Sequence, residues 1–282
     1  MESFIPVLKS SLTIMTPILF AAAGGLFPAL AGTLNIALEG LLLTGAFASI
    51  AVYHYSANAA ASIAAAVLAS LALSALHAFG AFKLRANVFI SGLAVNLFAG
   101  GLCVVLSDKI FNTRGVVALT SVPGLLKWYL VIGLLLLIAA WFVIYKTPFG
   151  YRLRACEKSE SALYSLGISA QFYRTSALLI SGFLAGLGGS FLSLNLGAFV
   201  PGMSAGKGWI ALVVIFLGGR KPQGILAAAF VFALAEALSN YAQGYLTIPA
   251  DFILAFPYVC TLIAMIAVSA FPYLGKGLTR GG

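Results

Sequence analysis

Apolar stretches of membrane-spanning length recur from one end of this chain to the other, and they limit the possible folds more than any other feature. Hydrophobic residues occupy 62% of the 282 positions and charged residues only 8%. A helix needs roughly 20 mostly apolar residues to cross a bilayer, so this length accommodates about eight to ten spans. We therefore expect an all-α, polytopic transmembrane helical bundle, with residues 1–282 forming a single domain.

Charged and turn-forming residues divide the apolar stretches into candidate spans. These are residues 11–30, 34–54, 58–80, 87–107, 128–145, 175–196, 208–219, 223–242 and 252–272. The run 208–219 is too short to cross a membrane and follows several glycines and a proline, so we expect a broken or re-entrant segment there. Non-helical backbone at membrane depth needs protein or a water-filled cavity around it, which implies a cavity beside this segment.

Lysine and arginine gather in the short loops between these spans. A net charge of +9 would suggest nucleic-acid binding in a soluble protein, but basic residues in short loops mark the cytoplasmic side of a membrane protein. We therefore expect no nucleic-acid partner. An alternating path places residues 146–174 and the C-terminus in the cytoplasm. The side of the N-terminus stays open, because residues 1–33 can cross once or lie partly at the interface.

The most polar part of the chain is a basic island in the middle of the sequence, residues 146–174. Within it, Ser159 or Ser161 can cap a short amphipathic helix of about two turns. One side of this helix would carry Ala162, Leu163 and Leu166. Such a helix can lie flat at the lipid headgroups or insert into a groove on another protein, and we prefer the groove.

Some polar residues lie inside the candidate spans, and we single out Asn35, Glu39, Asn96 and Glu236. An ionisable side chain at the bilayer centre is costly unless it faces a cavity or a partner. We therefore predict that these residues line or support a solute pathway. The alternative is hydrogen bonding between helices, worth about 0.6 kcal/mol per contact, and this is our preferred interpretation for the two asparagines.

Two sequence patterns of nucleotide-binding and metal-dependent enzymes are absent from the chain. It contains no GxxxxGK[ST] phosphate loop and no HExxH, and its three cysteines are scattered. We therefore expect no catalytic residues, no metal site and no ATP hydrolysis by this chain. Three classes remain: a subunit of an ATP-driven importer, an ion-coupled secondary transporter that uses Glu39 and Glu236, and a passive channel.

Three segments resemble the permease subunits of bacterial ATP-binding-cassette importers for simple sugars and nucleosides, the ribose-type family. Residues 32–40, Gly-Thr-Leu-Asn-Ile-Ala-Leu-Glu-Gly, resemble the family's G-x-x-N-x-G-x-E-G signature, with Ala37 at its middle glycine. Gly150, Arg154-Ala155, Ala162 and Gly167-Ile168 fall where the family has conserved loop residues. Residues 181–189 match its S-G-x-x-A-G-x-x-G pattern, whose small residues also predict close helix packing.

In that family the central loop holds a coupling helix that docks in a groove of a separate ATPase subunit. The resemblance assigns this role to Arg154, Ala155, Glu157, Ala162, Gly167 and Ile168. Glu157 departs from the pattern, because the family has glycine there, and so do Lys158 and the Ser159-Glu160 pair. These departures suggest a dedicated partner ATPase, which would bind the ATP and magnesium.

Glu39 resembles the short-permease subgroup of nucleoside and riboflavin importers. The resemblance implies a purine nucleoside or riboflavin as solute, with a simple sugar as the alternative. It also implies an extracytoplasmic substrate-binding lipoprotein and a larger second permease, so we favour a heterodimer over a homodimer.

Overall fold

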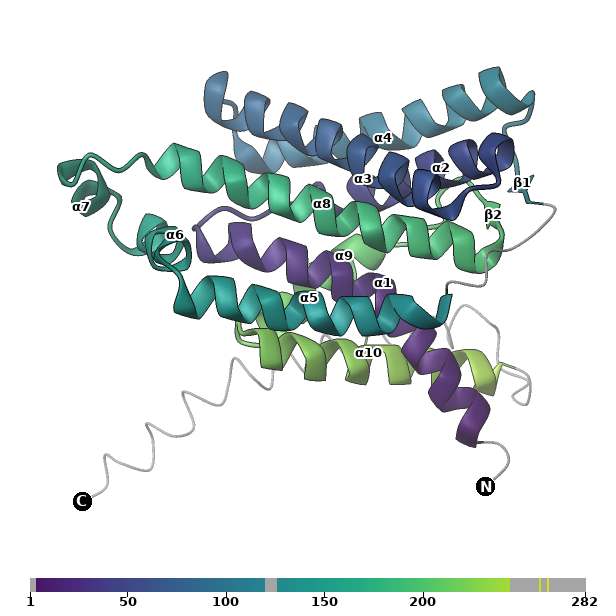
Figure 1. The fold of residues 1–282 in the computed structure, drawn as a ribbon. Coiled ribbons are helices and arrows are strands. Elements are labelled where there is room, and N and C mark those ends of the chain that lie inside the picture. The colour runs from purple at the N-terminus through teal and green to yellow at the C-terminus, as the bar shows by residue number, and fades with distance from the viewer. Residues whose placement is uncertain (1–3, 120–125, 244–258, 260–262, 264–282) are drawn as a thin grey trace.

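The fold is a bundle of long helices, seen in a computed structural model that describes residues 4–119, 126–243, 259 and 263 (Figure 1). In chain order its elements are α1 (Phe4–Leu30), α2 (Leu38–Ser56), α3 (Ala59–Ala78), the π-helical turn η1 (Phe79–Lys83), α4 (Val88–Phe111), β1 (Val117–Ala118), α5 (Leu126–Lys146), α6 (Pro148–Lys158), α7 (Glu160–Ser165), α8 (Ala170–Leu196), β2 (Ala198–Phe199), α9 (Lys207–Leu217) and α10 (Pro222–Ala242).

Six of the described helices are long and apolar enough to cross a membrane, which confirms the expected all-α polytopic bundle. They are α1, α3 together with η1, α4, α5, α8 and α10. A further helix of 19 residues, α2, packs against α3, α4 and α8, and several of its leucines are fully buried. The expected span at 252–272 lies outside the described residues, apart from 259 and 263.

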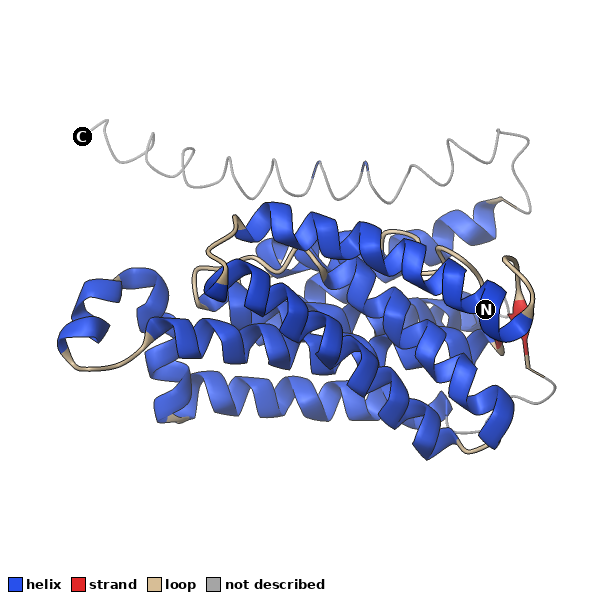
Figure 2. Ribbon diagram, turned by 90° about the horizontal axis from the view of Figure 1, so that it is seen from above, coloured by secondary structure: helices blue, strands red, loops and turns tan. Residues whose placement is uncertain are grey.

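The bundle has two ends. The α6–α7 pair projects beyond one of them, which we name the α6–α7 end (Figure 1; Figure 2). At the opposite end, the strand end, β1 pairs antiparallel with β2, with Val117 opposite Phe199. This pairing ties the segment after α4 to the segment after α8. Phe199 is fully buried, and its ring centroid lies 5.1 Å from that of Phe47 in α2.

Small residues let α8 pack closely against α2 and α3, as the sequence pattern predicts. A Cβ atom added to Gly182 would lie 2.5 Å from the Cβ of Ser74, and one added to Gly186 would lie 2.8 Å from the Cα of Val67. At Gly189 an added Cβ would overlap the carbonyl oxygen of Leu42. The backbones of α8, α2 and α3 therefore approach one another at distances that only small residues allow.

The short apolar run before residue 220 forms α9, a half-length helix. It has 11 residues, against 21 in the neighbouring α10, and its first residues contact α2 inside the bundle. A turn at 218–221 returns the chain into α10, and the backbones of Gly218 and Gly224 touch there. The segment expected to be broken or re-entrant is thus a short helix that begins inside the bundle, against α2, and ends beside α6.

Helices in the structure extend beyond the apolar stretches that predicted them. α1 begins at Phe4 and not at residue 11, and α8 begins at Ala170 and not at residue 175.

The basic island contains two helices. The predicted two-turn helix is α7, while α6 before it was not predicted. The start of α6 nevertheless carries two residues typical of helix N-termini. Thr147 accepts a capping hydrogen bond from the Gly150 amide, and Pro148 occupies the first turn.

We predict that Gly189→Ala destabilises the protein while Gly101→Ala does not. An added Cβ at position 189 would also lie 2.8 Å from the Ala46 amide nitrogen, and such overpacking costs about 1–3 kcal/mol. A Cβ at Gly101, in α4, meets nothing within 4 Å. Thermal unfolding in detergent should therefore show a lower melting temperature for G189A only. Equal melting temperatures would contradict the close contact of α8 with α2.

Candidate functional site

The connection between α1 and α2 is non-helical and lies against buried parts of the bundle. Asn35 is fully buried; its side-chain nitrogen donates to the Ser181 hydroxyl at 2.8 Å, and its oxygen accepts from the Ala37 amide at 3.1 Å. A second asparagine, Asn96 of α4, donates to the carbonyl of Ile36 at 2.8 Å. These bonds satisfy backbone groups that a continuous helix would have paired internally.

The first turn of α2 is fixed by polar side chains from two directions. The Asn96 oxygen accepts from the Gly40 amide at 2.8 Å, which holds α2 to α4. The Glu39 carboxylate points to α9, where Oε1 accepts from the Gly206 amide at 2.8 Å and Oε2 from the Gly208 amide at 2.7 Å. Glu39 therefore caps the N-terminus of α9 from another helix.

This cap is favourable for an electrostatic and a steric reason. The N-terminus of a helix carries partial positive charge and unpaired N–H groups, so it attracts a carboxylate. Gly206 has a φ of +80°, a conformation that suits glycine. A Cβ on Gly208 would lie 2.5 Å from the Cα of Glu39, so only glycine allows the two backbones to meet.

The other predicted carboxylate, Glu236 of α10, lies at the same end of α9. Its Oε1 is 3.7 Å from Nζ of Lys207, the first residue of α9, and the two side chains are 23% and 14% exposed. Two carboxylates, of Glu39 and Glu236, and the ammonium group of Lys207 therefore lie near the N-terminus of α9. We call Asn35, Glu39, Asn96, Lys207 and Glu236 the interior polar cluster.

Sequence reasoning selected four members of this cluster but missed Lys207 and the glycines that receive Glu39. The position of Lys207 in the sequence is unusual, because an alternating path through the spans puts it on the side of the membrane away from the basic loops. A lone lysine among apolar residues needs a carboxylate partner. The glycines gave no comparable signal, because their contact with Glu39 spans 167 and 169 residues of sequence.

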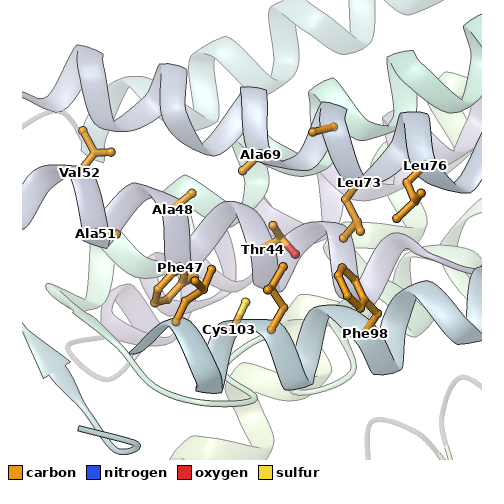
Figure 3. A pocket seen from close by; sticks show the side chains of 13 residues that line it. Thr44, Phe47, Ala48, Ala51, Val52, Ala69, Leu73, Leu76, Phe98 and Cys103 are labelled. Atoms are coloured by element: carbon orange, nitrogen blue, oxygen red, sulfur yellow. The ribbon is translucent and has the colours of Figure 1, made fainter. Parts of the chain in front are cut away.

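A separate pocket of about 490 Å³ lies among α2, α3 and α4 (Figure 3). Its labelled lining is apolar apart from Thr44 and Cys103, and the Thr44 hydroxyl already donates to the Gly40 carbonyl at 2.8 Å. None of the interior polar cluster lines this pocket. A polar solute would find few hydrogen-bonding groups there, so we place the candidate site at the start of α9.

At the α6–α7 end, the predicted coupling residues divide between two surfaces. Arg154, Ala155 and Ala162 line an open groove of about 430 Å³ between α6 and α7. Tyr151, Lys158, Ser159, Leu163 and Leu166 complete its lining. The Arg154 guanidinium lies 4.9 Å and 5.0 Å from the ring centroids of Tyr145 and Tyr151, which hold it in place.

The remaining predicted coupling residues lie outside this groove. Gly167, with a φ of +70°, and Ile168 form the turn that leads into α8. Glu157 pairs with Arg220 of the α9–α10 turn through two bonds of 2.8 and 2.7 Å. Arg220 lowers the pKa of Glu157 below its usual range, mainly through these hydrogen bonds. Glu157 therefore holds α6 to the bundle.

We predict that Glu39→Gln destabilises the protein more than Asp108→Asn. Glutamine can accept only one of the two backbone hydrogen bonds, and losing a bond to a charged group costs about 1.5–3 kcal/mol. Asp108 pairs with Arg114 at the surface, where such pairs contribute about 0–1 kcal/mol. Melting temperatures in detergent compare the two variants. A Glu39→Gln protein as stable as the Asp108→Asn control would show that the cap does not hold α9.

Comparison with known proteins connects this geometry to a transport family. The chain is 31% identical to the guanosine ABC transporter permease protein NupQ of Bacillus subtilis, over 92% of this chain and 90% of the relative. It is 30% identical to the nucleoside ABC transporter permease protein NupC of Lactococcus lactis, over 96% and 93%. TsgC13 of Haloferax volcanii, provisionally described as a glucose ABC transporter permease, is 28% identical over 95% and 88%.

A solved structure, PsaBC from Streptococcus pneumoniae in complex with Fab, has a similar fold. Its TM-score is 0.55 at 12% sequence identity, with 92% of this chain and 90% of that chain covered. The pattern of one family, described as the permease component of the branched-chain amino acid transport system, matches residues 7–268. This match extends over most of the chain, from α1 past α10. The chain belongs to this family of transport permeases.

Proposed function

We propose that this chain is a permease subunit of an ATP-binding-cassette importer that carries nucleosides across a bacterial inner membrane. The observation that carries the proposal is its similarity, over nearly the whole chain, to two permeases named for guanosine and nucleosides. The chain itself would be no enzyme, and ATP with its magnesium would bind to a partner ATPase. A simple sugar is the second candidate solute, because the similarity to TsgC13 is also nearly full-length.

The groove between α6 and α7 supports ATPase docking at this end of the bundle. Its lining combines the cations Arg154 and Lys158 with apolar side chains, and Leu166 is 73% exposed. An exposed apolar surface with fixed charges suits a protein partner that offers a carboxylate and an apolar side chain. In this arrangement residues 146–174 and the C-terminus lie in the cytoplasm.

The interior polar cluster supports a solute pathway beside α9. We propose that Asn35, Glu39, Asn96 and Glu236 line this pathway or hold its walls. Their bonds join α2 to α4 and α9, and α9 to α10. A flat base with ribose hydroxyls needs mostly apolar walls and only a few polar groups. A second permease would complete the pathway, and a binding lipoprotein would deliver the solute.

The contacts of Glu39 and Glu236 make an ion-coupled mechanism the weaker alternative. Glu39 already accepts two backbone hydrogen bonds, and Glu236 faces the Lys207 ammonium. A bound proton or sodium ion would neutralise the negative charge that favours each of these contacts. Uptake should therefore continue when the proton and sodium gradients are collapsed, and stop when ATP is depleted.

We predict that Ala162→Trp abolishes ATPase docking while Ser161→Trp does not. Ala162 lines the α6–α7 groove, so an indole there would fill the groove that we assign to the ATPase. Ser161 is also exposed on α7 but does not line the groove. Purification of the tagged permease with its ATPase, and uptake in cells, measure the effect. Normal docking and uptake in A162W would contradict the role of the groove.

The solute class can be tested by competition. Cells that express the whole transporter should take up labelled guanosine. When this guanosine saturates the transporter, unlabelled nucleosides of similar affinity at about ten times its concentration should reduce the uptake about tenfold. Ribose, glucose and riboflavin should have little effect. If glucose or riboflavin reduces the uptake and nucleosides do not, the solute belongs to the class of that competitor and is not a nucleoside.

A further inference from the structure

Two arginines at the α6–α7 end connect α6 and α7, the helices of the basic island, to the end of α1. The first, Arg220, lies in the turn between α9 and α10. Its guanidinium forms the two bonds to Glu157 of α6, and its Nη2 also donates to the carbonyl oxygen of Ala29. One side chain therefore joins α6, the end of α9 and the end of α1.

The second arginine, Arg174 in the first turns of α8, makes a parallel connection. It donates to Glu160 of α7 at 2.9 Å and to the backbone carbonyl of Cys156 in α6 at 3.1 Å. Its Nε donates to the carbonyl of Ala31 at 3.3 Å. The last carbonyls of a helix have no partner within the helix and carry partial negative charge, so they attract guanidinium groups. We call the pairs Arg220–Glu157 and Arg174–Glu160 the arginine clamp.

The clamp acts on the place where α1 ends and the non-helical connection to α2 begins. Gly32, with a φ of +74°, starts this connection, and a Cβ there would lie 3.2 Å from the Cα of Glu157. From Gly32 the chain passes through the buried Asn35 to Glu39. A displacement of α6 therefore presses directly on the segment that leads to the interior polar cluster.

The same displacement reaches the cluster by a second route. Arg220 follows α9, and the opposite end of α9 is held by Glu39. A helix of 11 residues is about 16 Å long. Charged groups hold both ends of α9, so this helix joins the α6–α7 end to the interior of the bundle.

Two features describe the Arg220–Glu157 pair. Arg220 has a φ of +56°, a left-handed conformation that also occurs after other helices, at Ala57 and Asn112. Its partner Glu157 has a pKa below the ordinary value of about 4.3 for glutamate. The pair therefore stabilises the folded protein fully above that ordinary pKa, and this stabilisation is lost as the pH falls through the lower pKa of the folded state. The pair is therefore intact at neutral pH.

We propose that Arg220 and Arg174 are positioning residues that transmit displacement of the α6–α7 pair to the α1–α2 connection and to α9. The inference rests on the proposed function, because it assumes that a partner ATPase moves α6 and α7. The family resemblance does not imply the Arg220–Glu157 pair, since that pattern has glycine at position 157. The clamp would thus be a coupling element particular to chains that carry this pair.

The test separates ATPase docking from coupling in the complete transporter. Glu157→Ala removes the link from α6 to Arg220 but leaves the groove residues in place. We expect the ATPase to remain bound and active, while the nucleoside taken up per ATP hydrolysed falls about tenfold, within the usual range of coupling free energies. Glu157→Gln, which keeps one acceptor oxygen for Arg220, should lie between wild type and Glu157→Ala.

Arg152→Ala is the matched control. Arg152 also joins α6 to the bundle, through a 3.1 Å bond from its guanidinium to the Tyr173 hydroxyl, but it does not reach α1 or α9. This variant should keep wild-type coupling, and melting temperatures identify any variant that fails to fold. If Glu157→Ala keeps wild-type uptake per ATP, or loses the ATPase altogether, the clamp does not transmit motion. If the wild-type permease binds no ATPase, the proposed function itself fails.

Discussion

The contact between the Glu39 carboxylate and the start of α9 is the interaction on which the interior of this bundle depends. A helix that begins inside an apolar bundle has several backbone N–H groups with no acceptor in the helix itself, so each needs another acceptor. Glu39 accepts two of these bonds and places a full negative charge at the positive end of the helix. Without it, two N–H groups at the start of α9 would lose their acceptor.

The break between α1 and α2 follows from the same constraint. Glu39 reaches α9 only because the preceding chain turns inward, and this unwound segment has its own unpaired backbone groups. Asn35 and Asn96 satisfy several of them and hold the segment to α8 and α4. The two asparagines thus bond to protein groups, as interhelical hydrogen bonding predicts. The non-helical backbone persists because protein surrounds it.

Much of this architecture can be predicted from the sequence, because membrane-spanning helices are recognised by length and apolarity alone. The short apolar run before residue 220 also predicted a broken or re-entrant segment, and the polar residues inside the spans predicted polar contacts within the bundle. The pairings could not be predicted. Asn35 meets Ser181 across 146 residues of sequence, and Glu157 meets Arg220 across 63. Hydrophobicity shows how deep a residue lies but not which helix it faces. Helix α6 was missed because four charged residues, Arg152, Arg154, Glu157 and Lys158, mark it as a loop between spans.

The contact between Gly208 and Glu39 divides α9 into residues that can vary and residues that cannot. Any side chain at position 208 would push the two backbones apart, whereas the side chains of Trp209 and Phe216 are 40% and 41% exposed. Substitutions of these two aromatic residues should therefore disturb the packing of α9 less than a side chain at position 208 would. A mutant library built on this helix should hold its glycine constant and diversify the aromatic positions.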